Sequence, residues 1–372
     1  MSLFICQIIP PCLLTKYDVS QAQTMFCLKL LNSKHFDNVV SLVQTNVIPN
    51  ILQEIGHDEI KYVQNRFFLQ KGCFKLLNNI FENIVIVKHS LAENIIWYNN
   101  INAQTLLSCI INKFLLRKKV YAILTDHTDS NNCLTVNYWI KRVLEKLNGL
   151  VSLSSRTDIK NSNMFFLPGI VLSNSITSSS KIFNHTSFLF SGSLSKVTGI
   201  DLALKVFAKL PKLVLHISGK GELVDMVKQY SEKYSNIIYH GFMDVDSYKK
   251  MSKQIDFCLS LRNPSLPENR NNFPSKSLEY LSDAKILIST ILYPELDGVK
   301  YVYSDYSEEA LANVVVKLSQ MDEDELKQYA NNKDVLLKKI SERAWKHAFE
   351  YLELNDMKNI YCTDVLVKSR HT

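Results

Sequence analysis

The chain has 372 residues, of which 46% are hydrophobic and 21% charged, a composition typical of folded globular proteins and unlike that of disordered chains. A single domain commonly has about 100–200 residues, so two domains are expected. The net charge is +7, all of it within residues 1–183, and this surplus is too small for a nucleic-acid-binding stripe.

Nothing in the sequence indicates a membrane-spanning or secreted protein. No apolar run reaches the roughly 18 residues that a spanning helix needs. The opening residues 1–12 have a short apolar stretch without a preceding basic region, which predicts a β-strand and a cytoplasmic protein. The eight cysteines include no CxxC pair and no zinc-ligand spacing, so we expect reduced, mostly buried thiols.

In the first half of the chain, short apolar runs alternate with amphipathic stretches. Strands are predicted over 3–9, 38–43, 83–88, 94–99 (as a strand or a loop edge), 120–126, 149–155 and 164–169. Helices are predicted over 21–34, 103–119 and 135–147. This alternation predicts a first α/β domain.

The second half alternates more strictly. Strands are predicted over 187–192, 213–219, 236–241, 256–261 and 286–290, and helices over 199–210, 223–234, 246–254, 274–284 and 341–354. Such strands form parallel sheets covered by helices, which bind ligands at the carboxyl ends of their strands. The Ser/Asn-rich stretch 172–185 is predicted to link the two domains.

The sharpest segment is NNFPSKSLEYL, residues 271–281. Pro274 favours a helix start, and the amides that follow would face outward at the positive end of the helix dipole, where anions bind. Lys276 adds a positive charge, and Glu279 lies one turn further on, where a carboxylate could accept hydrogen bonds from a ribose. These residues suggest a nucleotide-sugar site; the alternative is a well-capped surface helix.

Four segments carry a family resemblance: FSGSLSKVTGIDLAL (190–204), LHISGKGEL (215–223), NIIYHGF (236–242) and NNFPSKSLEYLSDAKILIST (271–290). In this order they resemble the donor-binding half of a GT-B glycosyltransferase of glycosyltransferase family 4 (group 1). The resemblance is strongest to enzymes of bacterial-type polysaccharide and lipopolysaccharide assembly with an FPSK-x-x-EY donor motif.

The resemblance implies an α/β fold of two Rossmann-like domains that face each other across a cleft. We place an N-terminal acceptor-binding domain at 1–175 and a C-terminal donor-binding domain at 184–341, with 345–372 packing back on the first. The last helix, around Trp345 to Leu354, would make that crossing.

The resemblance also assigns donor-binding roles residue by residue. Gly192 and Gly219 would end strands beside the donor, Gly241 and Phe242 would border the base, Pro274, Ser275 and Lys276 would face the phosphates, and Glu279 would hold the ribose. Asn271 stands where the family has another Glu. Ser193 and Thr198 stand where many members carry Arg and Lys, which leaves Lys196 and Lys276 to neutralise the diphosphate.

The segment ILTDHTDS (123–130) supplies candidate catalytic residues. Asp126 and His127 follow a predicted strand, in a loop that faces the transferring sugar in similar enzymes. His127 could hydrogen-bond a sugar hydroxyl or a developing charge. The alternatives are a polar surface residue or a metal site with Asp129. The resemblance implies that no metal or other cofactor is needed.

The stretch KFLLRKK (113–119) joins apolar side chains to four cations. Such a helix suits contact with an anionic membrane surface, at about 1 kcal/mol per well-placed cation. The alternative is a helix packed on its own sheet with a solvated basic end.

We therefore predict a glycosyltransferase that moves a hexose from a nucleotide diphosphate sugar to a glycan or lipid-linked saccharide, in surface polysaccharide biosynthesis. The resemblance implies retention of the anomeric configuration. One alternative is a nucleotide-sugar epimerase or hydrolase on the same fold. Another is a non-catalytic, glycosyltransferase-like binding subunit, which the departures at Ser193, Thr198 and Asn271 would explain.

Overall fold

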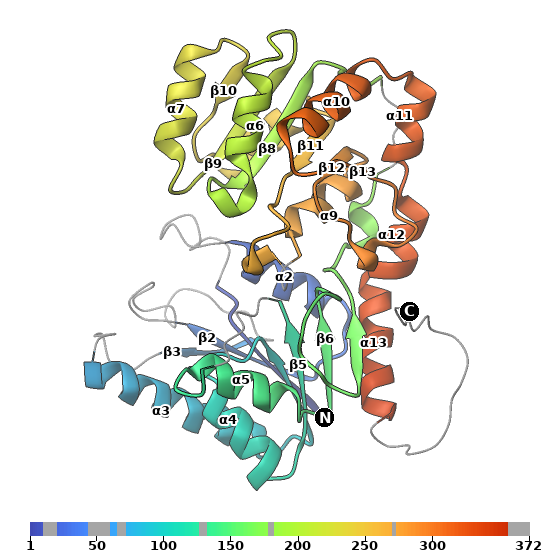
Figure 1. Ribbon diagram of the computed structural model, residues 1–372. Coiled ribbons are helices and arrows are strands. Elements are labelled where there is room, and N and C mark those ends of the chain that lie inside the picture. The colour runs from blue at the N-terminus through green and yellow to red at the C-terminus, as the bar shows by residue number, and fades with distance from the viewer. Residues whose placement is uncertain are drawn as a thin grey trace.

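The structure, a computed structural model, describes residues 1–9, 21–43, 60–64, 72–125, 132–177, 182–269 and 273–355. Its strands form two sheets, and neighbouring strands are parallel throughout the described residues. Figure 1 shows the second sheet above the first, with helices packed around both. The predicted α/β class with two Rossmann-like sheets is confirmed.

The first sheet has the strand order β3-β2-β1-β4-β5-β6-β7. Its strands are β1 (Ser2–Cys6), β2 (Asn38–Val43), β3 (Ile60–Gln64), β4 (Ile95–Asn99), β5 (Lys119–Leu124), β6 (Gly149–Ser152) and β7 (Met164–Phe166). The helices of this part are α2 (Gln21–Leu31), α3 (Gly72–Ser90), α4 (Leu106–Ile110), which the π-helical turn η2 (Ile111–Leu115) continues, and α5 (Val136–Leu144). The central strands are apolar and buried on both faces, as helix-covered parallel strands are.

The second sheet has the order β10-β9-β8-β11-β12-β13. Its strands are β8 (Ser187–Ser193), β9 (Val214–Lys220), β10 (Ile237–Tyr239), β11 (Phe257–Ser260), β12 (Ile286–Ser289) and β13 (Val302–Tyr303). Its helices are α6 (Ile200–Phe207), α7 (Val224–Lys233), α8 (Val245–Ser252), α9 (Ser275–Ser282), α10 (Glu308–Ser319), α11 (Glu323–Ala330) and α12 (Lys333–Ile340). The buried Phe188 ring packs between Phe207 and Phe257, with ring centroids 5.3 and 4.9 Å away.

The last helix, α13 (Glu342–Asn355), runs back along the first sheet (Figure 1). The indole Nε1 of buried Trp345 donates to the carbonyl of Gly169 at 2.7 Å. Further along, Glu353 Oε1 accepts from Trp97 Nε1 of β4 and lies against His35 Nε2, both at 2.8 Å. A C-terminal helix that crosses back was predicted, and these contacts hold it there.

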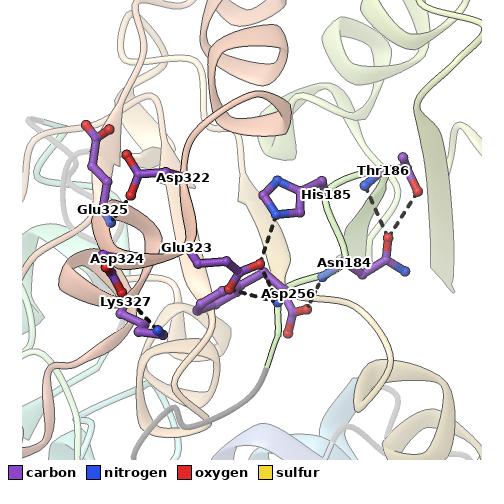
Figure 2. A network of polar contacts seen from close by, with 10 residues as sticks. Asn184, His185, Thr186, Asp256, Asp322, Glu323, Asp324, Glu325 and Lys327 are labelled. Carbon is purple, nitrogen blue, oxygen red and sulfur yellow. Dashed lines mark hydrogen bonds and ion pairs between the residues drawn. The ribbon is translucent and has the colours of Figure 1, made fainter.

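A polar network fixes the start of β8 against neighbouring elements (Figure 2). The backbone amide of Asn184 donates to Asp256 Oδ2 at 2.8 Å. His185 Nε2 lies 3.0 Å from Glu323 Oε1 at the start of α11. The register of β8 with β9 and β11 then sets where its far end, which carries Gly192, lies.

The run 83–88, predicted as a strand, lies in helix α3, so that prediction was wrong. Its apolar side chains do not alternate as a strand requires, since Ile86 is buried whereas Ile84 is 61% exposed. The buried positions described in α3 follow helical spacing, at Asn78, Glu82, Asn83, Ile86 and Ser90. Four of these five are polar, so the hydrophobic pattern could not reveal the helical face.

Buried Glu82 makes the stability depend on pH. Burial raises the pKa of its carboxyl group to about 7, against 4.5 for an ordinary glutamate. Between these pH values the folded chain keeps a proton that the unfolded chain releases. The free energy of unfolding therefore falls as the pH rises between these values. The total loss is about 3 kcal/mol and is complete once the pH exceeds 7.

We expect Glu82→Gln, which cannot ionise, to remove this dependence. Chemical denaturation of both proteins at about pH 4.5 and pH 8 measures it. The variant should gain about 3 kcal/mol on the wild type between the two conditions. A stability difference that is the same at both pH values would contradict the assignment.

Candidate functional site

Three glycines meet at one edge of the second sheet, where β8, β9 and β10 end. Gly192 and Gly219 are partners in the register of β8 and β9. The backbone amide of Gly219 donates to the carbonyl of Gly241, just past β10, at 3.0 Å. We call this cluster of Gly192, Gly219 and Gly241 the glycine edge. It lies at the carboxyl ends of the strands, where parallel sheets hold their ligands.

The backbone at the glycine edge is crowded in one place and open in two. A Cβ on Gly219, whose φ is +154°, would lie 1.9 Å from the carbonyl oxygen of Gly192. At Gly192 (φ +135°) and Gly241 (φ +74°) an added Cβ would meet no atom within 4 Å. Glycine is therefore needed at position 219 for close approach, while free space adjoins the main chain at the other two.

An aromatic ring borders the glycine edge. Phe242 follows Gly241 and is 62% exposed. The Lys220 ammonium lies over this ring, 4.5 Å from its centroid. An exposed ring held by a cation offers a flat apolar surface on which a planar group can stack.

Helix α9 begins next to the second sheet's carboxyl edge. Pro274 is its N-cap residue, with φ −72°. In the first turn, Ser277 Oγ donates to Ser260 Oγ at the end of β11, at 3.2 Å. The first amides of a helix have no partner within the helix and lie at its positive end. The two serines thus place this positive end beside the end of β11.

A chain of contacts joins α9 to the glycine edge. The Lys276 ammonium lies 4.1 Å from the centroid of the Tyr248 ring of α8. The Tyr248 hydroxyl is 3.0 Å from Ser191 Oγ, and the Tyr280 hydroxyl is 2.7 Å from the same atom. Ser191 directly precedes Gly192, so these contacts set the position of Lys276 relative to the glycine edge.

Lys276 and Glu279 share one face of α9. Lys276 Nζ lies 3.9 Å from Glu279 Oε2, with both side chains more than a third exposed. A weak, solvated ion pair of this kind costs little to open. Both groups are therefore available to a ligand that carries an anion and a hydroxyl pair.

The loop after β8 is shaped by the residues that depart from the family pattern. Thr198 Oγ1 donates to the carbonyl of Ser193 at 2.7 Å and closes a capping box with Ser195. Lys196 stands in the 3-10 turn η4 (Lys196–Thr198), where its backbone amide donates to Glu222 Oε1 at 3.3 Å. Thr198 thus shapes the turn that carries Lys196.

Residues 178–335 match a protein-family model described as Glycosyl transferases group 1. The match spans the whole second sheet, including the glycine edge and α9. This region is a glycosyltransferase group 1 domain. No curated protein sequence matches it.

Solved structures share the architecture of the whole chain. Anabaena Alr3699/HepE in complex with UDP has a TM-score of 0.70 and 14% identity, covering 95% of this chain and 99% of that one. Sucrose-phosphate synthase from Thermosynechococcus elongatus has a TM-score of 0.69 and 11% identity, covering 95% and 98%. The Candida albicans trehalose-6-phosphate phosphatase N-terminal domain has a TM-score of 0.70 and 11% identity, covering 95% of this chain and 96% of that one. The glycosyltransferase therefore has the GT-B fold.

In the first sheet, the described residues stop just short of the predicted catalytic residues of this glycosyltransferase. Asp126 and His127 lie outside the described residues, as does Asn271 in the second half. The last described residue before them is Thr125, whose amide donates to Asn100 Oδ1 at 3.0 Å. This contact joins the ends of β4 and β5 and sets where the chain leaves β5.

Sequence reasoning missed several polar residues at the site of the glycosyltransferase. Ser191, Tyr248 and Tyr280 connect β8, α8 and α9, and Arg262 follows β11 with its Nη1 donating to Asn269 Oδ1 at 2.9 Å. The only local signal was a serine directly before Gly192 in an otherwise apolar run. The tyrosines meet Ser191 from 57 and 89 residues away in the sequence, which no local pattern shows.

Two features are absent from the described ranges. No helix there has both the length and the apolar character that membrane crossing requires. No three His, Cys, Asp or Glu side chains in the described ranges are grouped so that they could hold a metal ion.

Proposed function

We propose that the chain transfers a hexose from a nucleotide diphosphate sugar to a hydroxyl group of a glycan or a lipid-linked saccharide. The observation that carries this proposal is the position of Lys276, which the Tyr248–Ser191 contacts tie to Gly192 at the glycine edge. The site therefore combines open main chain at the glycine edge with the Lys276 cation at the start of α9. A diphosphate binds to groups of this kind. The UDP bound by the Anabaena structure is consistent with this donor class.

In this reaction the bond between sugar C1 and the diphosphate oxygen breaks, and the acceptor hydroxyl oxygen bonds to C1 while its proton passes to water. The diphosphate leaves with additional negative charge. Lys276, Lys196 and the start of α9 would stabilise that charge, and Glu279 would accept hydrogen bonds from the ribose. We infer that no metal is needed and that transfer proceeds with retention of the anomeric configuration. We also infer that the reaction takes place in the cytoplasm, during assembly of a surface polysaccharide such as lipopolysaccharide.

Thermal unfolding with UDP-, GDP- and dTDP-sugars tests the proposal. A ligand at 100 times its Kd stabilises the folded state by about 2.7 kcal/mol, so one donor should raise the melting temperature clearly. Failure of every nucleotide sugar to do so would contradict the proposal. If the donor binds and, in the absence of an acceptor, free nucleotide diphosphate or an epimer is released, a hydrolase or epimerase is favoured. Binding without any turnover would favour a non-catalytic subunit.

Glu279→Ala locates the ribose within that site. We expect donor affinity to fall by about 1.5–3 kcal/mol, because a hydrogen bond to a charged group is lost. The fold should survive, since the Glu279 side chain is partly exposed and only weakly paired. Titration calorimetry with the donor that binds gives the change, with Glu232→Ala on α7 as the matched control. Wild-type affinity in the Glu279 variant would show that the ribose lies elsewhere.

We further propose that the first domain contacts an anionic membrane surface through one face. Exposed apolar side chains lie on α3 and on the adjoining α4 and η2: Leu76, Leu77, Ile80, Ile84, Leu107, Phe114 and Leu115. We call these residues the α3–η2 face. Across 76–119 the charged side chains are five Lys and Arg against two acids, and both acids, Glu82 and Glu93, are buried. Within 76–119 the charged side chains that reach solvent are therefore positive.

Vesicle sedimentation tests the membrane contact. The wild type should bind phosphatidylglycerol-containing vesicles and leave neutral phosphatidylcholine vesicles largely unbound, because attraction falls with lipid charge. The double variant Ile84→Ser/Leu115→Ser should lose most of this binding. A control pair of exposed residues in the second half, Ile182→Ser/Leu292→Ser, should bind as the wild type does. Equal binding by both double variants would contradict the assignment of the face.

A further inference from the structure

One arginine of the first half reaches into the loops of the second sheet. Arg156 follows β6, and its Nη1 donates to the backbone carbonyl of Asn269 at 2.8 Å. Its guanidinium also lies over the Tyr293 ring, 5.1 Å from the centroid. The neighbouring amide of Ser155 donates to Glu295 Oε1 at 2.6 Å. Two adjacent residues therefore attach the first sheet's carboxyl side to two separate loops of the second.

Asn269, which receives Arg156, connects the loops at the second sheet's carboxyl edge. Its side chain is buried, and its Oδ1 accepts from Arg262 Nη1 at 2.9 Å. Its Nδ2 donates to the carbonyls of Val197 and Asn263, both at 3.0 Å. Both polar atoms of this buried amide are therefore used in holding loops together, which makes its position well defined.

The loops that Asn269 holds carry the two candidate phosphate cations. Val197 directly follows Lys196 in η4. Phe273 and Pro274, which lead into α9 and Lys276, come four and five residues after Asn269. Phe273 also packs against Tyr293, with ring centroids 4.8 Å apart, so the ring under Arg156 touches the start of the same segment.

Resting on the proposed function, we propose that Arg156 is a positioning residue for the donor. Through Asn269 and Tyr293 it sets the loops that carry Lys196 and Lys276, so donor affinity depends on a residue of the opposite domain. Glu295 acts in the same way through Ser155. Its second carboxylate oxygen, Oε2, is buried without a hydrogen-bond partner, so loss of the Ser155 contact would leave both oxygens of this carboxylate without the hydrogen bonds described for it.

The consequence is a coupling between domain arrangement and donor binding. When the Ser155 and Arg156 contacts are made, the cation loops are held in their binding geometry, and a bound donor must favour these contacts to the same extent. Loss of the contacts should weaken donor binding and leave the chemical step at saturating donor nearly unchanged, because a bound donor itself holds Lys196 and Lys276 in the binding geometry.

Titration of UDP and GDP into the full chain, together with donor kinetics, tests the proposal. With the nucleotide that binds, Arg156→Ala should raise Kd and the donor KM about 3- to 30-fold, with kcat within about twofold. Arg156→Lys, which can still donate to the Asn269 carbonyl, should recover most of the affinity. Arg142→Ala, an exposed arginine of the same domain, is the matched control and should bind as the wild type does.

Glu295 separates positioning from direct contact. Glu295→Ala should weaken nucleotide binding in the same direction as Arg156→Ala, while Glu295→Gln, which keeps an acceptor for the Ser155 amide, should stay near wild type. An anionic side chain has no attraction to a diphosphate, so a loss on its removal reports positioning. Unchanged or tighter nucleotide binding by Glu295→Ala would overturn the proposal. A reduced melting temperature of Arg156→Ala and Glu295→Ala with unchanged nucleotide affinity would overturn it as well. If the wild type binds neither nucleotide, the proposed function itself fails, a distinct result.

Discussion

Replacing Lys276 with alanine is expected to lower kcat/KM for sugar transfer by about 10²–10³-fold. That is the usual loss when one group that stabilises developing charge is removed. The diphosphate gains charge as it leaves, so this cation acts more strongly in the transition state than on the bound donor. Both kcat and donor affinity should fall, with the larger part of the loss in kcat.

Lys276→Ala should affect donor chemistry without disturbing the fold. Its ammonium contacts the Tyr248 ring and the Glu279 carboxylate at a partly exposed position, so its loss should change the melting temperature little. Steady-state kinetics with varied donor give the result. Lys228→Ala, an exposed lysine of α7 in the same domain, controls for net charge. Wild-type kcat/KM in the Lys276 variant would remove Lys276 from the site and point to Lys196.

The sequence predicted those features of the second half that are local. Glycines are scarce, so their recurrence directly after apolar runs at Gly192, Gly219 and Gly241 indicated the carboxyl ends of strands. The reason for glycine at position 219 is not local, because it is the approach of the Gly192 carbonyl from the neighbouring strand. The pattern thus located the glycine edge, and the packing of strands explains it.

Features that depend on distant contacts or on buried polar groups were missed. In α3, burial of Asn78, Glu82 and Ser90 gives the helix a polar inner face, so the Ile/Val run was taken for a strand. Strand β3 at the sheet edge and helices α10 to α12 were not predicted. The contact of Arg156 with Asn269 joins residues 113 apart in the sequence. Pairings of this kind arise only once both sheets are assembled.

The carboxyl end of β4 carries an unpaired polar side chain. Asn99 ends β4 with a buried side chain, and neither its amide nitrogen nor its amide oxygen has a hydrogen-bond partner in the structure. Such a group is costly unless something pairs with it, and it lies at the edge from which the chain continues to His127.

His127→Ala is expected to reduce transfer by about 10²-fold or more at saturating donor, the scale of a lost acid, base or oriented hydrogen bond at the reacting centre. Nucleotide affinity should stay nearly intact, because the proposed nucleotide contacts belong to the second sheet and α9. His127 comes two residues after Thr125, whose bond to Asn100 joins the ends of β4 and β5 at the first sheet's carboxyl edge. Steady-state transfer and donor titration on this one variant distinguish the outcomes. Wild-type values for both would make His127 a surface residue, and weaker donor binding with normal turnover would place part of the nucleotide against the first domain.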